Sequence, residues 1–231
     1  MRRRIAALTL SRQLGFILAF MCAQASAHTV GVTLDAGTMG FGADLGTQII
    51  QNTLDVRAGF TSYTYSRSGT YSKDGSVIPY NGQFQLSGIP VLLDWLPFHG
   101  AFRVTAGAFD NRTNFNLDAT PAPGSTVTIN GNVYPASAVG SFTGKVDYTR
   151  KIEPYLGIGW GNLAPKRAGF VYNVDLGVIF TGSPQVTLNA SNPTNNATLT
   201  ADVASAQASA QANANSATMW PLIQVGLGYA F

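Results

Sequence analysis

The chain has 231 residues, with 14 Lys and Arg, 11 Asp and Glu, and a single cysteine. Four of the basic residues, Arg2, Arg3, Arg4 and Arg12, lie within residues 1–27, so the remainder carries ten basic and eleven acidic side chains. This near-balance gives no electrostatic argument for nucleic-acid binding. Because no cysteine follows residue 27, disulfides and thiolate metal sites are excluded from the rest of the chain.

Residues 1–27 predict a secretory signal peptide. Residues 2–4 form a basic n-region, residues 14–21 an apolar h-region, and residues 25–27 (Ala-Ser-Ala) a small-residue cleavage site. Cys22 follows a methionine rather than the small residue that lipoprotein processing needs. We therefore expect an exported mature chain that begins at His28.

The rest of the chain contains no apolar run near the ~20 residues that a transmembrane helix needs. It contains segments in which large apolar residues alternate with small or polar ones, the pattern of a strand with two different faces. The predicted strands are residues 30–36, 41–49, 54–60, 84–95, 102–108, 152–160, 170–180 and 223–231. Only a closed barrel lets strands cross a bilayer with every backbone group paired. We therefore predict an all-β fold for residues 28–231, an eight-stranded antiparallel transmembrane β-barrel in an up-and-down meander.

Apart from the first turn, the predicted connections alternate in length, as they do in outer-membrane barrels. Residues 37–40 form a tight first turn, and an even strand count places both ends of the chain on one side. The other short connections are residues 51–53, 97–100 and 162–168. The long ones are residues 66–82, 110–147 and 183–218. We expect the three short connections at residues 51–53, 97–100 and 162–168 in the periplasm and the long ones outside the cell.

Two long connections contain dipeptides typical of two-residue hairpin turns, Asp74-Gly75 and Asn130-Gly131. They predict strand extensions that project beyond the membrane. The apolar alternation changes phase near Ser87-Gly88, which predicts a β-bulge.

The third long connection ends in a low-complexity tract of Ala, Asn, Ser, Thr and Gln over residues 195–218, after an extended stretch at residues 183–193. Asp202 is its only charge. An isolated helix at about residues 201–212 would be marginal, and we expect disorder.

Several stretches resemble small outer-membrane proteins of the CarO type. They are Gly144-Lys145-Val146-Asp147-Tyr148, Phe180-Thr181-Gly182-Ser183-Pro184-Gln185-Val186, and residues 36–42 and 152–159. The resemblance implies an eight-stranded outer-membrane barrel associated with uptake of ornithine and other basic amino acids and with carbapenem susceptibility. The last strand, ending in Phe231, resembles the closing strand that barrel-assembly machinery recognises.

Inside the predicted barrel, strand alternation directs eight ionisable side chains inward. They are Asp44, Asp55, Arg57, Asp94, Arg103, Lys151, Glu153 and Asp175. Side chains nearly fill the lumen of an eight-stranded barrel, and buried charges must pair. Two hypotheses stay open: a structural salt-bridge plug, or an acid-biased path that favours cationic solutes such as ornithine.

No enzyme or cofactor site is predicted. The two histidines are His28, at the expected mature N-terminus, and His99, in a predicted periplasmic turn, and neither suits a nucleophilic triad on the outer rim. The function predicted is a narrow channel or uptake protein for small solutes. The alternative is a non-conducting surface barrel that acts through its loops. Both place the protein in the bacterial outer membrane, in contact with its lipid and lipopolysaccharide.

Overall fold

The computed structural model describes residues 29–73, 76–148, 150–165 and 167–231. The predicted signal peptide and the Asp74-Gly75 turn lie outside these residues. Within the described part of the chain, no helix has the length and apolar character needed to cross a membrane.

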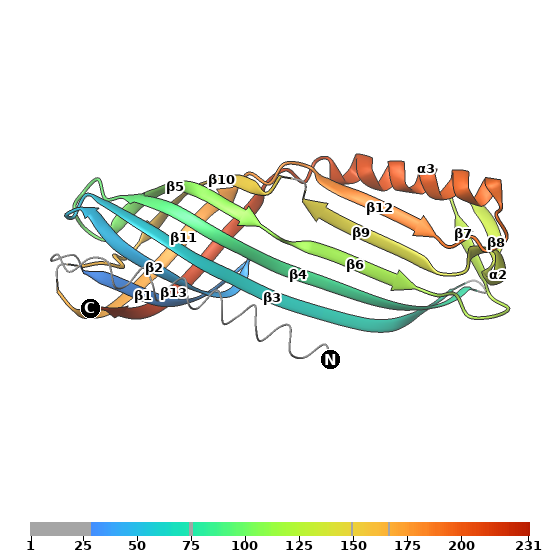
Figure 1. The fold of residues 1–231 in the computed structure, drawn as a ribbon, viewed down its shortest axis with the longest axis horizontal. Helices are drawn as coiled ribbons and strands as arrows, with labels where there is room; N and C mark the ends of the chain where they lie inside the picture. Colours follow the sequence, from blue (N-terminus) through green and yellow to red (C-terminus); the bar gives the residue numbers. More distant parts are fainter. Residues whose placement is uncertain (1–28, 74–75, 149, 166) are drawn as a thin grey trace.

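Eight antiparallel strands form a closed ring (Figure 1), which confirms the predicted barrel. Around the ring they follow chain order, and the last strand pairs back with the first. They are β1 (Val30–Gly37), β2 (Gly40–Ile50), β3 (Leu54–Lys73), β4 (Ser76–Trp95), β5 (Phe102–Asn111), β10 (Ile152–Trp160), β11 (Gly169–Ile179) and β13 (Trp220–Ala230).

The first hairpin has the predicted tight turn. Gly37 pairs with Gly40, and only two residues lie between them. Gly40 has a φ of 98°, a conformation that glycine adopts without the steric cost of a side chain.

Beyond the ring, β3 and β4 continue as a long ribbon, and three more strands extend the sheet from β4, each paired with the one before it (Figure 1). These are β6 (Asn114–Ala119), β9 (Phe142–Tyr148) and β12 (Pro184–Ala190). We call this five-stranded extension, which includes residues 63–73 of β3 and 76–87 of β4, the distal sheet. The predicted strand extension in the connection between β3 and β4 is thus confirmed.

The polarity of β4 reverses where the strand leaves the ring. Within the ring Asp94 is buried, whereas Val91 and Leu93 are 53% and 47% exposed on the outer side. In the distal sheet the inner side carries Phe84 and Leu86.

The predicted bulge at Ser87-Gly88 is wrong. The register between β3 and β4 is the same on both sides of this point, from Ala58↔Val91 to Thr61↔Gly88 and beyond. Apolar side chains change face because the surroundings of the two faces change, while the strand continues unbroken.

The expectation of disorder over residues 195–218 is also wrong, because α3 (Ala197–Ala214) lies along the free edge of β12 (Figure 1). Gln211 Oε1 accepts the backbone N–H of Val186 at 2.8 Å, and Gln207 Oε1 accepts that of Leu188 at 2.9 Å. The helix thus satisfies edge groups that would otherwise invite another strand.

A small apolar core fixes the N-terminal part of α3, through Leu199 and Val203. There a hairpin of β7 (Thr126–Ile129) and β8 (Asn132–Pro135) leads into α2 (Ala136–Val139). The predicted turn is confirmed, since Asn130 and Gly131 have φ values of 50° and 84°. The core consists of Ile129, Tyr134, Val139, Leu199 and Val203.

Candidate functional site

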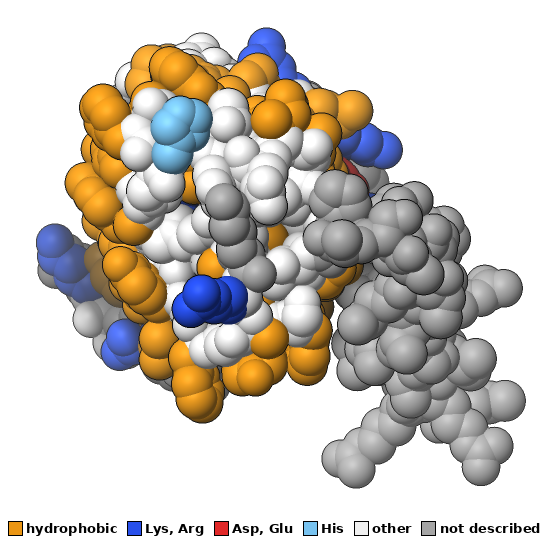
Figure 2. Space-filling model, turned by 90° about the vertical axis from the view of Figure 1, so that its left-hand side faces the viewer, with side chains coloured by type: hydrophobic (Ala, Val, Ile, Leu, Met, Phe, Trp, Pro, Cys, Tyr) orange, Lys and Arg blue, Asp and Glu red, His pale blue; other side chains and the backbone are white. Residues whose placement is uncertain are grey.

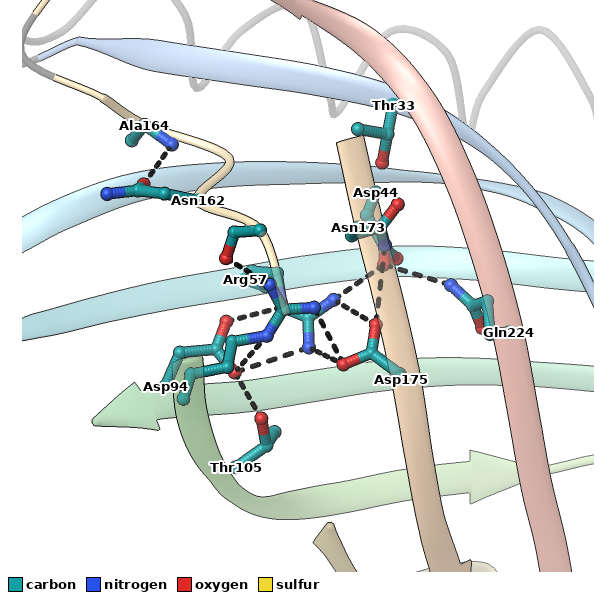
Figure 3. Close-up of polar contacts among 12 residues, drawn as sticks. Thr33, Asp44, Arg57, Asp94, Thr105, Asn162, Ala164, Asn173, Asp175 and Gln224 are labelled. Atoms are coloured by element: carbon teal, nitrogen blue, oxygen red, sulfur yellow. Dashed lines mark hydrogen bonds and ion pairs between the residues drawn. The ribbon is translucent and has the colours of Figure 1, made fainter. Parts of the chain in front are cut away.

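Arg57 lies at the centre of a charge network inside the ring (Figure 3). Its Nη1 and Nη2 donate to the two carboxylate oxygens of Asp175, each at 3.0 Å. Nη1 also donates to Asp44 Oδ2 at 3.3 Å, and Nη2 to Asp94 Oδ1 at 3.2 Å. The Arg57 side chain is 1% exposed, so the site is closed to solvent. Its three partners come from three other strands, β2, β4 and β11.

Arg103, from β5, shares two of these carboxylates. Its Nη2 donates to Asp175 Oδ1 at 2.7 Å, and its Nε lies 3.6 Å from Asp94 Oδ1. Asp94 therefore pairs with both arginines. The remaining Nη1 donates to the carbonyl of Gly161 at 2.6 Å, which ties the network to the connection between β10 and β11.

Neutral side chains complete the network, and sequence reasoning missed them. Thr105 donates to Asp94 at 2.6 Å, and Gln224 to Asp44 at 3.2 Å. Asn173 donates to Asp175 at 3.3 Å. Each lies on the inward side of an alternating strand, so the alternation places it in the lumen. Because these side chains are neutral, a search for ionisable residues does not find them.

Asp35 was missed as well, although it lies on the inward side of β1. It is 5% exposed and accepts a hydrogen bond from Thr33 at 3.1 Å. Two predicted residues, Asp55 and Glu153, are buried but lie outside the arginine pairs. Glu153 instead accepts from Asn111 at 2.9 Å.

The predicted inward position of Lys151 is wrong. The residue precedes β10, which begins at Ile152, and its side chain is exposed. Its backbone carbonyl accepts the N–H of Asn111 at 3.0 Å. The described lumen therefore holds six buried carboxylates against two arginines, a larger acidic excess than the sequence predicted.

An apolar layer closes the lumen on the side of the distal sheet. Its buried side chains are at most 4% exposed. Phe109 and Tyr155 contact each other, with ring centroids 5.4 Å apart. The layer consists of Met39, Leu92, Phe109, Tyr155, Ile179 and Leu222.

The connection between β10 and β11 closes the other end. Leu163 and Ala164 are 2% and 0% exposed. The backbone of Leu163 lies so close to Gly31 that a Cβ on the glycine would be 1.7 Å from its carbonyl oxygen. This short connection therefore folds into the ring. The charge network lies between two blocked ends.

The outside of the ring is apolar. Figure 2 views the molecule from the end with the short turns, where hydrophobic side chains lie around most of the visible circumference. Phe170 is 94% exposed and Leu227 74%. Near this end, aromatic rings contact one another in two series, Phe98–Phe102–Trp160 and Phe170–Tyr229–Phe231.

His99 lies in a short turn at the same end, as predicted. Its φ is 52°, and its Nδ1 lies 2.9 Å from the backbone oxygen of Asn52. Among the described residues, no group of three or more acidic or histidine side chains is arranged to hold a metal ion.

Comparisons with known proteins point to one fold. No family model matches the chain, and no curated protein matches it either. The chain does resemble solved structures, among them two from Acinetobacter baumannii. Acinetobacter baumannii CarO2 is 22% identical, with a TM-score of 0.56 over 88% of this chain and 98% of the other. Acinetobacter baumannii CarO is 20% identical, with a TM-score of 0.53 over 87% and 97%. The structure therefore confirms the resemblance predicted from the sequence: the chain has the fold of the CarO proteins.

Proposed function

We propose that this protein is a bacterial outer-membrane β-barrel with a closed lumen that acts at the cell surface through its distal sheet. The observation that carries the proposal is the polarity reversal along β3 and β4. Within the ring the outer side is apolar and the inner side charged, and beyond Thr61 and Gly88 the outer side becomes polar. An apolar outside is stable in lipid, and a polar outside is stable in water.

This reversal gives the proposed orientation. The ring lies in the bilayer and the distal sheet outside the cell, so the short connections at residues 51–53, 97–100 and 162–168 face the periplasm. The aromatic series at the turn end match the girdles that such barrels carry at membrane interfaces. Export through the signal peptide at residues 1–27 and recognition of β13 and Phe231 by barrel-assembly machinery belong to the same proposal.

The closed lumen favours the surface role over conduction. A permeating solute would have to displace the Leu163 connection, separate Arg57 and Arg103 from their carboxylates, and part the apolar layer. Breaking a buried ion pair by leaving one partner uncompensated costs about 3–5 kcal/mol. The network therefore acts as a structural plug.

One observation favours a second candidate, uptake of small cationic solutes such as basic amino acids. Six buried carboxylates face two arginines, so an opened lumen would attract cations. Opening would have to free the connection that Arg103 holds through the Gly161 carbonyl.

Planar-bilayer recording on refolded mature protein distinguishes these candidates. We expect no conductance steps in the wild type, with or without ornithine. We also expect Asp94→Asn to lose stability against urea without gaining conductance. Uptake would be supported, and the plug rejected, by cation-selective steps in the wild type that ornithine blocks. Asp94→Asn should then reduce the cation selectivity at little cost in stability.

A further inference from the structure

We propose that the outer face of the distal sheet binds the oligosaccharide of the glycolipid that surrounds the barrel in the outer leaflet, lipopolysaccharide. This inference rests on the proposed membrane orientation and adds a partner for the distal sheet. It begins with one row of residues that are direct neighbours across five strands. The middle row is Ser66, Gln83, Asn116, Lys145 and Thr187.

The rows on either side have the same character. The row nearer the ring is Thr64, Gln85, Asn114, Asp147 and Gln185. The row farther out is Ser68, Asn81, Asp118, Thr143 and Asn189. All the side chains in these three rows of five are hydrophilic, and all are exposed or half-buried.

The hydrophilic character belongs to the outer face alone, because the opposite face of the same strands is different. All five residues of one row on that face are apolar or aromatic: Tyr65, Phe84, Phe115, Val146 and Val186. The polar side is the one continuous with the lipid-facing side of the ring, because alternate residues of a strand share a face. The occupant of this face is therefore whatever surrounds the barrel just above the hydrocarbon.

The height of the face matches a headgroup layer. On β3, the exposed Phe60 lies on the same side as Thr64, about 13 Å further along the strand at ~3.3 Å per residue. Ser68 lies roughly 13 Å beyond Thr64 by the same measure. The polar rows thus begin shortly above the apolar surface, where the sugars of the surrounding glycolipid lie.

The chemistry of the face favours sugar over phosphate. Twelve of the fifteen positions are neutral amides or hydroxyls, which both donate and accept hydrogen bonds as sugar hydroxyls do. Lys145 is the single cation, and its Nζ lies 2.7 Å from Asp147 Oδ2. A phosphate site would need unpaired cations, and here the carboxylates outnumber the lysine.

A hollow on this face provides a place for a sugar ring. It has a volume of about 390 Å³, within the ~300–1,000 Å³ of small-molecule sites. Polar side chains from four strands line it, among them Gln83, Asn116, Asp118, Thr143 and Thr187. Because these strands pair directly with one another, the donors and acceptors are held in fixed relative positions.

The test uses full-length refolded protein and two purified lipids: lipopolysaccharide with its core oligosaccharide, and the same lipid trimmed to its phosphorylated anchor. We expect the complete glycolipid to bind about tenfold more tightly, as a few net hydrogen bonds would give. Asn116→Ala combined with Thr187→Ala should remove most of that preference. The control pair, Ser205→Ala with Ser209→Ala on the exposed side of α3, should retain it.

Detached core oligosaccharide should compete for binding, and inorganic phosphate should not. Equal affinity for the two lipids, competition by phosphate alone, or an unchanged preference in the Asn116/Thr187 variant would overturn the inference. Heat-modifiable gel migration checks that each variant folds. A protein that never enters bilayers contradicts the proposed function, whereas one that enters them without a sugar preference contradicts only this inference.

Discussion

The ring and the distal sheet use the same strands with opposite polarity. In the ring, Arg57 is buried inside while Leu93 faces outward, and in the distal sheet Phe84 lies on the inner side and Gln83 on the outer. The β3–β4 register does not change between them. Side-chain alternation thus reflects the medium on each side of a strand, and a change of medium along the strand can resemble a β-bulge in the sequence.

The two regions also close their interiors differently. The ring is filled by ion pairs between two arginines and several carboxylates. The distal region relies on an apolar core and on glutamines that occupy a strand edge. Charge-dependent stability should therefore be concentrated in the ring.

The largest expected effect follows from removing the central cation. Arg57→Ala leaves Asp44, Asp94 and Asp175 without their main partner, and we expect a loss of about 3–5 kcal/mol in the free energy of unfolding. Urea titration of the refolded protein measures it. Arg67→Ala, on the exposed part of β3, is the matched control and should change stability by less than about 0.5 kcal/mol. Equal losses in the two variants would contradict the claim that the buried ion pairs of the ring stabilise the fold more than an exposed charge does.

A second pair of substitutions tests the polarity reversal on one face of β4. Leu93→Arg places a charge on the proposed lipid side and should cost roughly 2–4 kcal/mol near mid-membrane. Gln83→Arg, ten residues earlier on the same face, should cost little because water already surrounds that position. Folded fractions in lipid vesicles provide the comparison. Similar tolerance at both positions would argue against the boundary.

The smallest effect concerns the link between α3 and the β7–β8 hairpin. Tyr134 donates to Asp202, as do Asn132 at 2.7 Å and Asn130 at 3.1 Å. These hydrogen bonds, that from Tyr134 foremost, lower the pKa of Asp202. A carboxyl with a lowered folded-state pKa stabilises the fold above its unfolded value of about 3.9, and that contribution is lost as the pH falls toward the folded value.

Amide exchange in β7 and β8 checks this pH dependence. Protection should be constant from neutral pH to about 4 and fall below it. In Asp202→Asn, protection should be lower at neutral pH and should not change across that range. A wild-type profile identical to that of the variant would show that Asp202 does not hold the hairpin.

Much of the barrel could be predicted from the sequence, because the side chains of a strand in a membrane-spanning ring alternate between the lumen and the outside. All eight strands and the inward positions of Asp44, Arg57, Asp94, Arg103 and Asp175 follow from that pattern. Lys151 did not fit, since the pattern does not fix where a strand begins.

The distal region was less predictable. The helix α3 has little amphipathic pattern of its own, and its order depends on Gln207, Gln211 and Leu199 contacting segments distant in the chain. The change of phase near Ser87-Gly88 likewise depends on surroundings that the local sequence does not contain. Local patterns cannot reveal that the medium outside a strand changes from lipid to water partway along it.

The most direct test of the central claim is cysteine scanning along the outer face of β4. The only native cysteine is Cys22, within the predicted signal peptide, so each introduced thiol in the mature protein would be unique. We expect cysteines at Val91 and Leu93 to resist a water-soluble thiol reagent and to contact a lipid-dissolved quencher. Cysteines at Asn81 and Gln83 should show the reverse. The same accessibility at all four positions would contradict a membrane boundary near Gly88, and with it the proposed orientation of the molecule.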